Sequence, residues 1–312
     1  MQTPFDLTHA PPIGMAETLA PGLQVVTAPN ASPMTFTGTR SYILGDDDVV
    51  LIDPGPLDAA HETALLAALG GRRVGHILVT HAHVDHSPLA QRLSQRLDAP
   101  VLGFGPAHAG RSPLMAQLAS AAELGGAEGI DAGFTPHKTL ADGDIIAGAG
   151  WALRAVHTPG HLSNHLCFAW DDARALFSGD HVMGWASTLI SPPDGDLAAF
   201  MQSLERLESM PGYRYYPGHG APVADGLTIA RHLAAHRRNR ADQILTALAA
   251  QPATPAELVA RIYTDIPPAL HGAAARNVLA HLLDELAKGR IAHRGALKSD
   301  AVFFIQSQYL SK

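Results

Sequence analysis

The stretch Thr80-His81-Ala82-His83-Val84-Asp85-His86-Ser87 places three histidines and an aspartate within six positions. The apolar run at residues 74–79 predicts a buried strand before it, and residues 89–97 have helical spacing after it. We therefore expect the stretch on a turn at the rim of an α/β sheet, where sites are usually built. Neutral imidazole and carboxylate groups are good zinc ligands, and one tetrahedral ion would not use all four comfortably. The stretch therefore predicts a site for two adjacent metal ions.

Three later segments repeat this placement of a metal-binding side chain just after a predicted strand. They are His161 after a strand at residues 151–157, Asp180 after one at 175–177, and His219 after one at 213–216. A glycine lies beside each of the three, which lets the backbone turn tightly and brings the side chain to the rim. Four separate segments are therefore expected to meet at one site.

Four further residues near these segments have two interpretations each. Asp53, at the end of a strand predicted at 49–52, either orients a metal-bound histidine or caps a tight turn. His165 either orients a metal ligand from behind or is a buried structural histidine. His181, beside Asp180, either touches the substrate or is a partly exposed neighbour, and Trp185 either walls the pocket or only packs there.

Composition narrows the class of protein. The 312 residues suffice for about two domains, and the net charge of −7 argues against a general nucleic-acid binder. Cys167 is the only cysteine, which excludes an intramolecular disulfide; its apolar surroundings predict a small buried residue rather than a nucleophile. We find no signal-peptide pattern and no apolar run of membrane-spanning length, so a soluble protein of the cytoplasm is expected, without membrane contact.

The order of predicted elements divides the chain into three parts. Residues 1–20 are Pro-rich and predict an irregular N-terminal arm, residues 21–225 form the first domain, and residues 226–312 form a separate helical domain. Within the first domain, residues 104–140 have no clear strand pattern, and we interpret them as a helix-containing excursion near the site mouth. His108 and His137 in this excursion are expected on the surface.

The last part has the pattern of a winged helix. A long helix at residues 227–250 is followed by a helix from Pro255, a third from 267 to about 288, and a hairpin from residues 291–294 and 301–305. The third helix is expected to bury one face and expose the other, on which Asp284 and Glu285 would repel phosphate. The buried face is Ala275, Leu279, Leu282 and Leu286, and the other carries Asn277, His281, Asp284, Glu285 and Lys288. We therefore favour a packing or dimerisation role, while Arg231, Arg237, Arg238 and Arg240 could form a basic stripe toward the site.

The ligand set His-x-His-x-Asp-His, followed by His161, Asp180 and His219, resembles the metallo-β-lactamase superfamily over roughly residues 20–225. The resemblance implies an α/β fold, the four-layer αβ/βα sandwich of two similar halves, with a small C-terminal winged-helix-like domain. It implies one metal on His81, His83 and His161 and a second on Asp85, His86 and His219, with Asp180 bridging them. Asp85 and Asp180 would be the catalytic carboxylates. Asp180 departs from the commoner class B β-lactamases, which have a cysteine there, and matches the glyoxalase II-like, lactonase-like and phosphodiesterase-like pattern.

With its C-terminal part, the whole chain resembles β-lactamase-like hydrolases that include a mitochondrial endoribonuclease. The resemblance implies a metal-dependent hydrolase with two zinc ions and a metal-bridging hydroxide, although His/Asp sites also accept iron or manganese. A small ester, thioester or lactone is the expected substrate. The alternatives are an endoribonuclease acting on single-stranded RNA and a ligand-sensing winged-helix regulator, and a homodimer through the C-terminal domain is the partner considered.

Overall fold

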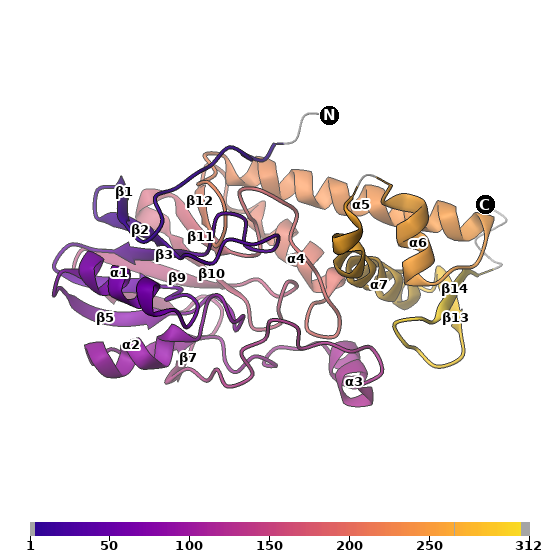
Figure 1. The fold of residues 1–312 in the computed structure, drawn as a ribbon, viewed down its shortest axis with the longest axis horizontal. Helices are drawn as coiled ribbons and strands as arrows, with labels where there is room; N and C mark the ends of the chain where they lie inside the picture. The colour runs from indigo at the N-terminus through magenta and orange to yellow at the C-terminus, as the bar shows by residue number, and fades with distance from the viewer. Residues whose placement is uncertain (1–3, 265, 307–312) are drawn as a thin grey trace.

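The computed structural model describes residues 4–264 and 266–306. Its larger part consists of two β-sheets packed face to face, with helices on the outside (Figure 1). The chain runs through one sheet and its helices, then through the other, and ends in a helical region beside the sandwich. Side chains from both sheets meet in one core that includes Leu44, Ile52, Leu153 and Phe168. The predicted αβ/βα sandwich is confirmed.

The first sheet has seven strands in chain order, antiparallel from β1 to β4 and parallel from β4 to β7. Its strands are β1 (Ala16–Ala20), β2 (Leu23–Thr27), β3 (Arg40–Leu44), β4 (Asp48–Ile52), β5 (Arg73–Leu78), β6 (Val101–Gly103) and β7 (Lys138–Thr139). Two helices, α1 (Ala59–Leu69) and α2 (Leu89–Leu97), cover its outer face. Asp58 begins α1 by accepting a hydrogen bond from the His61 amide at 2.8 Å, and Gly70 ends it in the left-handed conformation.

The second sheet has the order β12-β11-β10-β9-β8, with only the β11–β12 pair parallel. Its strands are β8 (Ile145–Gly148), β9 (Trp151–His157), β10 (Leu166–Trp170), β11 (Ala175–Gly179) and β12 (Arg214–Pro217). Helix α4 (Leu197–Leu207) and the first half of α5 (Gly226–Ala250) cover its outer face. A short 3₁₀ turn, η1 (Asp171–Ala173), joins β10 to β11.

The C-terminal region combines helices with a small hairpin, as the sequence predicts. It contains the second half of α5, α6 (Pro255–Ile262), η2 (Pro268–Leu270), α7 (His271–Ala287), β13 (Ile291–Arg294) and β14 (Val302–Ile305). Thr254 and Glu257 form a capping box that begins α6. Helix α3 (Pro113–Ala121), from the predicted excursion, packs against this region through Met115 and Leu118, and His108 and His137 are exposed as expected.

The N-terminal arm is not irregular throughout, because Ala16–Ala20 form β1 at the edge of the first sheet. Ala16 pairs with Val26 and Glu17 with Val25. An edge strand that is covered on one side only needs no continuous apolar run, and no residue of β1 is fully buried. The hydrophobic pattern of the sequence therefore did not predict β1, and it did not predict β7 or β8 either.

The C-terminal region is also less separate than predicted, because α5 belongs to two cores. Leu227, Ala230 and Leu233 pack with α4 against the second sheet, whereas Ile244 and Leu248 pack with the C-terminal helices. The predicted exposed face of α7 is wrong, since His281 and Glu285 are 1 % and 0 % exposed. They face α4 and α5, so the neighbouring helices cover the side that a free winged helix would expose.

The basic stripe on α5 does not form. Arg237 is buried, with 3 % of its surface exposed, and Arg231 pairs with Glu208. Arg240 lies over the ring of Tyr263, 3.8 Å from its centre. A helix that packs on two cores turns one side of its basic cluster inward. Within the described residues, no helix combines the length and the apolarity needed to cross a bilayer.

Candidate metal centre

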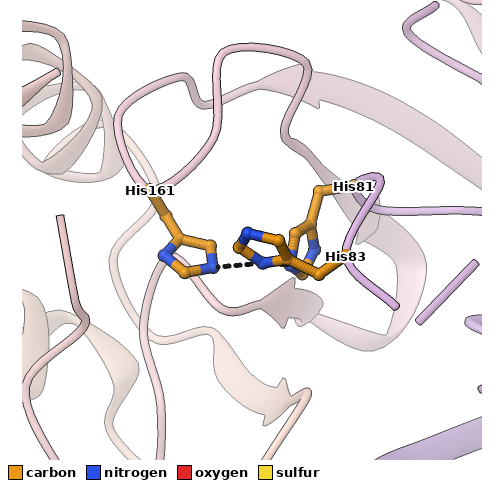
Figure 2. Close-up of side chains that lie close together, drawn as sticks. All are labelled: His81, His83 and His161. Atoms are coloured by element: carbon orange, nitrogen blue, oxygen red, sulfur yellow. Dashed lines mark hydrogen bonds between the residues drawn. The ribbon is translucent and has the colours of Figure 1, made fainter. Parts of the chain in front are cut away.

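The first cluster of the site joins the turn after β5 to the loop after β9. The His83 Nδ1 atom lies 2.8 Å from His81 Nε2 and 2.9 Å from His161 Nε2. Figure 2 shows these three rings converging from opposite sides of the rim. His81 and His161 are buried and His83 is half-buried, and the three form a group with the spacing of metal ligands.

The hydrogen bonds behind the first cluster fix its tautomers. The Thr80 hydroxyl donates to Asp53 Oδ2 at 2.7 Å, so it can only accept from His81 Nδ1, 2.9 Å away. The His161 Nδ1–H donates to the carbonyl oxygen of Leu189 at 2.7 Å. Both rings therefore direct the lone pair of Nε2 at His83, and one proton on His83 could satisfy only one of them. Burial lowers the pKa of His83 to about 3, so three neutral imidazoles meet, and a cation fits this arrangement better than hydrogen bonds do.

The second cluster combines His86 and His219 with a carboxylate. The Nε2 atoms of the two rings are 3.3 Å apart, and Asp85 Oδ2 lies 3.1 Å from His219 and 3.4 Å from His86. Behind them, His86 Nδ1 donates to Asp53 at 2.9 Å, and His219 Nδ1 donates to the carbonyl oxygen of Gly38 at 3.3 Å. Both rings therefore turn Nε2 toward the same point. Asp53 contacts the His86 ring and also accepts the Thr80 amide at 2.7 Å in the turn.

Asp180 lies between the two clusters. Its Oδ2 atom is 3.3 Å from His219 Nε2 and 3.7 Å from His161 Nε2, and its Oδ1 atom is 3.5 Å from His86 Nε2. The Asp180 amide donates to His165 Nε2 at 3.2 Å, and the His165 Nδ1–H donates to the Thr158 hydroxyl. His165 is thus a buried histidine that accepts a hydrogen bond from the backbone of Asp180. Burial raises the pKa of Asp180, but the charges of His219 and His86 outweigh this effect and hold the pKa well below its ordinary value.

Charge in the second cluster is balanced by protons in the metal-free protein. Burial opposes protonation of His219, but the charges of Asp180 and Asp85 raise its pKa to about 10. Burial also opposes protonation of His86, yet Asp85 and Asp180 raise its pKa well above the ordinary value. A divalent cation could replace these two protons and compensate the same carboxylates. The donor set therefore fits metal on chemical grounds as well as in geometry.

A loop at residues 188–190 positions two of these side chains from behind. The carbonyl oxygen of Leu189 accepts a hydrogen bond from the His161 Nδ1–H, and the Thr188 hydroxyl donates to the carbonyl oxygen of Asp180 at 2.7 Å. The loop is held by the C-terminal helices, because Arg237 of α5 donates to the carbonyl oxygen of Thr188 and Asn277 of α7 accepts the Ile190 amide at 3.0 Å. Sequence reasoning missed these contacts, since Arg237 and Asn277 were expected on exposed faces.

The two predicted substrate contacts have different surroundings. His181 is fully buried, and its ring lies edge-to-face on Phe200 at 4.8 Å, so it is not a partly exposed neighbour and does not reach the open side of the site. Helix α4 covers it. Trp185 is half-buried and stacks on Phe36 at 5.0 Å between ring centres. Phe36, two residues before Gly38 behind His219, was not singled out from the sequence and has an unusual positive φ of 55°.

The comparisons with known proteins agree with this arrangement. The profile described as the metallo-beta-lactamase superfamily matches residues 34–219, which includes every residue of both clusters. The profile described as the beta-lactamase associated winged helix domain matches residues 254–299.

The chain is similar to enzymes and to solved structures over most of its length. An atrochrysone carboxyl ACP thioesterase of Aspergillus fumigatus is 30 % identical, covering 82 % of this chain and 78 % of the relative. A beta-lactamase-like protein 2 homolog of Drosophila melanogaster is 28 % identical, covering 88 % and 91 %. A beta-lactamase domain protein from Burkholderia ambifaria has a TM-score of 0.80 and 25 % identity, covering 96 % of each chain.

Family, fold and donor set together show a metal-dependent hydrolase. Its C-terminal region matches the winged helix domain that is associated with beta-lactamase domains. With more than half of its length matched by the family profile, the chain belongs to the metallo-beta-lactamase superfamily.

Proposed function

We propose that this protein is a dinuclear-metal hydrolase that cleaves a thioester of a small acyl group, with the water oxygen becoming part of the released carboxylate. The observation that carries the proposal is the position of Asp180, whose two carboxylate oxygens face ring nitrogens of both clusters at 3.3–3.7 Å. One metal would be held by His81, His83 and His161, and another by Asp85, His86 and His219, with Asp180 shared. Zinc fits these donors, and iron and manganese fit them too.

Two divalent ions at such a site would supply Lewis acidity and an activated water at neutral pH. The chain supplies the proton acceptor, to which we assign Asp85. It is the more exposed carboxylate of the site, with 19 % of its side chain accessible, against 9 % for Asp180. The Thr39 hydroxyl donates to Asp85 Oδ2 at 3.2 Å and orients it. Water adds to the acyl carbon and gives one proton to Asp85, and the carbon–sulfur bond then breaks. The thiolate leaves without help from an acid because it is a weak base, and the released carboxylic acid gives its remaining proton to solvent.

Apolar residues at the mouth support an acyl substrate. Val84, between His83 and Asp85, is 47 % exposed, and Met34, in the loop that leads to Thr39, is 48 % exposed. Phe36 and Trp185 stack on each other, and each lies on a loop that contacts His219. Gly38, on the loop of Phe36, accepts a hydrogen bond from the His219 ring, and Gly184, on the loop of Trp185, donates one to the His219 carbonyl oxygen. We therefore assign Trp185 to the wall of the acyl pocket. Relatives named as thioesterases also support this substrate class.

Cleavage of RNA and regulation by nucleic-acid binding have less support. An extended RNA strand needs cations on an open surface, and on α5 Arg237 is buried while Arg231 is paired with Glu208. A winged helix that reads a groove needs a free helix face, and α7 buries His281 and Glu285 against its neighbours.

The test is a substrate panel on the metal-loaded protein. It contains acyl-N-acetylcysteamine thioesters of increasing chain length, matched oxygen esters, a lactone and labelled single-stranded RNA, each at low and high salt. We expect the thioesters to turn over fastest, with weak dependence on salt because few phosphate contacts form. RNA cleavage that exceeds thioester cleavage and falls steeply with salt would overturn the proposed substrate, and Asp180→Asn identifies turnover that comes from this site.

A further inference from the structure

A second cavity lies away from the metal centre, where α4, α5 and α7 meet. Its volume is about 320 Å³. Leu197 and Met201 of α4 and Ala241 of α5 form an apolar wall, and Arg237 and His281 are polar groups in its lining. The cavity therefore combines a short apolar surface with buried polar side chains, which is the pattern of a small-molecule site.

Arg237 brings a buried positive charge to this cavity without a carboxylate partner. Its Nη1 atom donates to Asn277 Oδ1 at 3.2 Å, and its Nη2 atom donates to the carbonyl oxygen of Thr188. Its Nε atom has no hydrogen-bond partner, and in the part of the chain that the structure describes no carboxylate lies within ion-pair distance of the guanidinium. A buried charge without a counter-charge is costly, so an anion in the cavity would be stabilised there.

His281 provides a second unsatisfied polar group. It is 1 % exposed, and neither of its ring nitrogens has a hydrogen-bond partner among the described residues. Burial and the nearby cations hold the pKa of His281 well below its ordinary value. The ring is therefore neutral and offers one N–H donor to a ligand.

The remaining charges of the lining leave an excess of cations. Lys288 pairs with Asp284 at 2.5 Å, and Arg290 pairs with Glu285. The two charges within each pair neutralise each other. The remaining charges of the lining are two positive ones, on Arg237 and Arg238, and one negative one, on the exposed Asp242. A metal ion does not suit this cavity, because its histidine and carboxylates do not form a group with ligand spacing in the described residues.

We propose that this cavity binds a small organic anion, with a carboxylate or phosphate group at Arg237 and His281 and a short apolar body against Leu197, Met201 and Ala241. The guanidinium supplies a charge and the unpartnered Nε–H to either oxyanion, and the imidazole N–H adds a neutral donor. This site is separate from the metal centre and does not depend on the substrate proposed above.

The test measures binding of three probes to the full-length protein at constant ionic strength set with chloride. Sodium butyrate and inorganic phosphate carry the two oxyanions, and butyramide is the neutral match of butyrate. We expect at least one anion to raise the melting temperature and to give a saturable calorimetric isotherm, while butyramide gives neither. Which anion binds more tightly identifies the group recognised. Equal effects of the amide and both anions, or no effect of any probe, would overturn the proposal.

Variants locate the binding. Arg237→Gln should weaken anion binding by at least about tenfold, the loss typical of a charged contact. Arg231→Gln is the matched control, since it removes an exposed arginine of the same helix outside the cavity, and it should bind as the wild type does. If Arg237→Gln does not fold, Met201→Trp decides, because its larger side chain fills the cavity from a half-buried position. Undiminished binding in a folded Arg237→Gln or Met201→Trp protein contradicts the assignment.

A final comparison separates this cavity from the metal centre. The protein as purified and the same protein after chelation with EDTA should bind the anion with equal affinity. Binding that disappears with the metal would place the anion at the metal centre and would overturn the proposal.

Discussion

The guanidinium of Arg237 donates a hydrogen bond to the carbonyl oxygen of Thr188, a residue 49 positions earlier in the chain. The Thr188 hydroxyl donates in turn to the carbonyl oxygen of Asp180, so two hydrogen bonds connect the long helix α5 with the residue between the two clusters. A ligand side chain must be held in place by its neighbours to bind metal tightly. The C-terminal helices are therefore part of the support of the metal centre.

Arg237→Gln should weaken metal binding by about 10- to 100-fold, the range typical of outer-shell partners. The measurement is competition with a chelating dye, with Arg231→Gln as the control on the same helix. Unchanged metal affinity in a folded Arg237→Gln protein would show that the loop at residues 188–190 is held without this bond.

Asp180→Ala should lower the metal content from close to two ions per chain and abolish hydrolysis, because among the described residues no other carboxylate faces ring nitrogens of both clusters. Metal content is measured by elemental analysis together with turnover. Asp172→Ala, in the exposed turn η1, is the matched control and should keep both. An Asp180→Ala protein with full metal content and full turnover would refute the assignment.

Metal binding to the chelated protein should release protons near neutral pH. The pKa of His219 is raised to about 10 in the metal-free cluster and that of His86 is also raised, so both rings carry a proton at pH 7.5 that a bound metal must displace. The released protons, about two per chain, are measured by calorimetry in buffers of different ionisation enthalpy. Because the raised pKa values mean that metal competes with protons, metal affinity should decrease as the pH is lowered below 7.5. Proton release near zero at pH 7.5 would mean that both rings are neutral without metal.

The Cys167 thiol should not react with iodoacetamide in the native protein. Burial raises its pKa to about 12, despite a hydrogen bond with Thr158, so only ~10⁻⁴ of it is thiolate at pH 8. Mass spectrometry after alkylation measures the reaction, and the same protein in guanidinium should react fully. Rapid native labelling without loss of structure would contradict the buried position of Cys167.

Truncation after residue 225 should damage solubility more than substrate binding. It removes Leu227, Ala230 and Leu233, which cover the second sheet together with α4. A chain ending at residue 250 keeps this cover and is the comparison, with aggregation measured by size-exclusion chromatography. A soluble, native-like 1–225 protein would show that α5 is dispensable for the sandwich, and the elution of the full chain tests the predicted homodimer.

The order of strands and helices could be predicted from the sequence because each buried strand of the sandwich is a continuous or alternating apolar run. The grouping of the candidate metal centre could be predicted because His81, His83, Asp85 and His86 lie together on one turn, and His161, Asp180 and His219 each follow a strand next to a glycine. Local pattern and local turn chemistry are properties of short segments, and a sequence displays them directly. β1 and β8 escaped because half-exposed strands at or near sheet edges lack such runs.

Only the tertiary structure decided which side of each helix is buried in the C-terminal region. Arg237, Asn277, His281 and Glu285 have the residue types of a solvent-exposed face, and the sequence alone predicts them there. Arg237, His281 and Glu285 are buried and Asn277 is half-buried because α4, α5 and α7 pack against one another. Asn277 accepts a hydrogen bond from Ile190, 87 positions away, whereas His281 has no hydrogen-bond partner among the described residues. Such contacts depend on how distant segments meet, and the cost of burying a charge is visible only when the neighbours of that charge are known. The support behind Asp180 and the cavity beside Arg237 therefore follow from packing, whereas the donor set of the metal centre follows from the sequence.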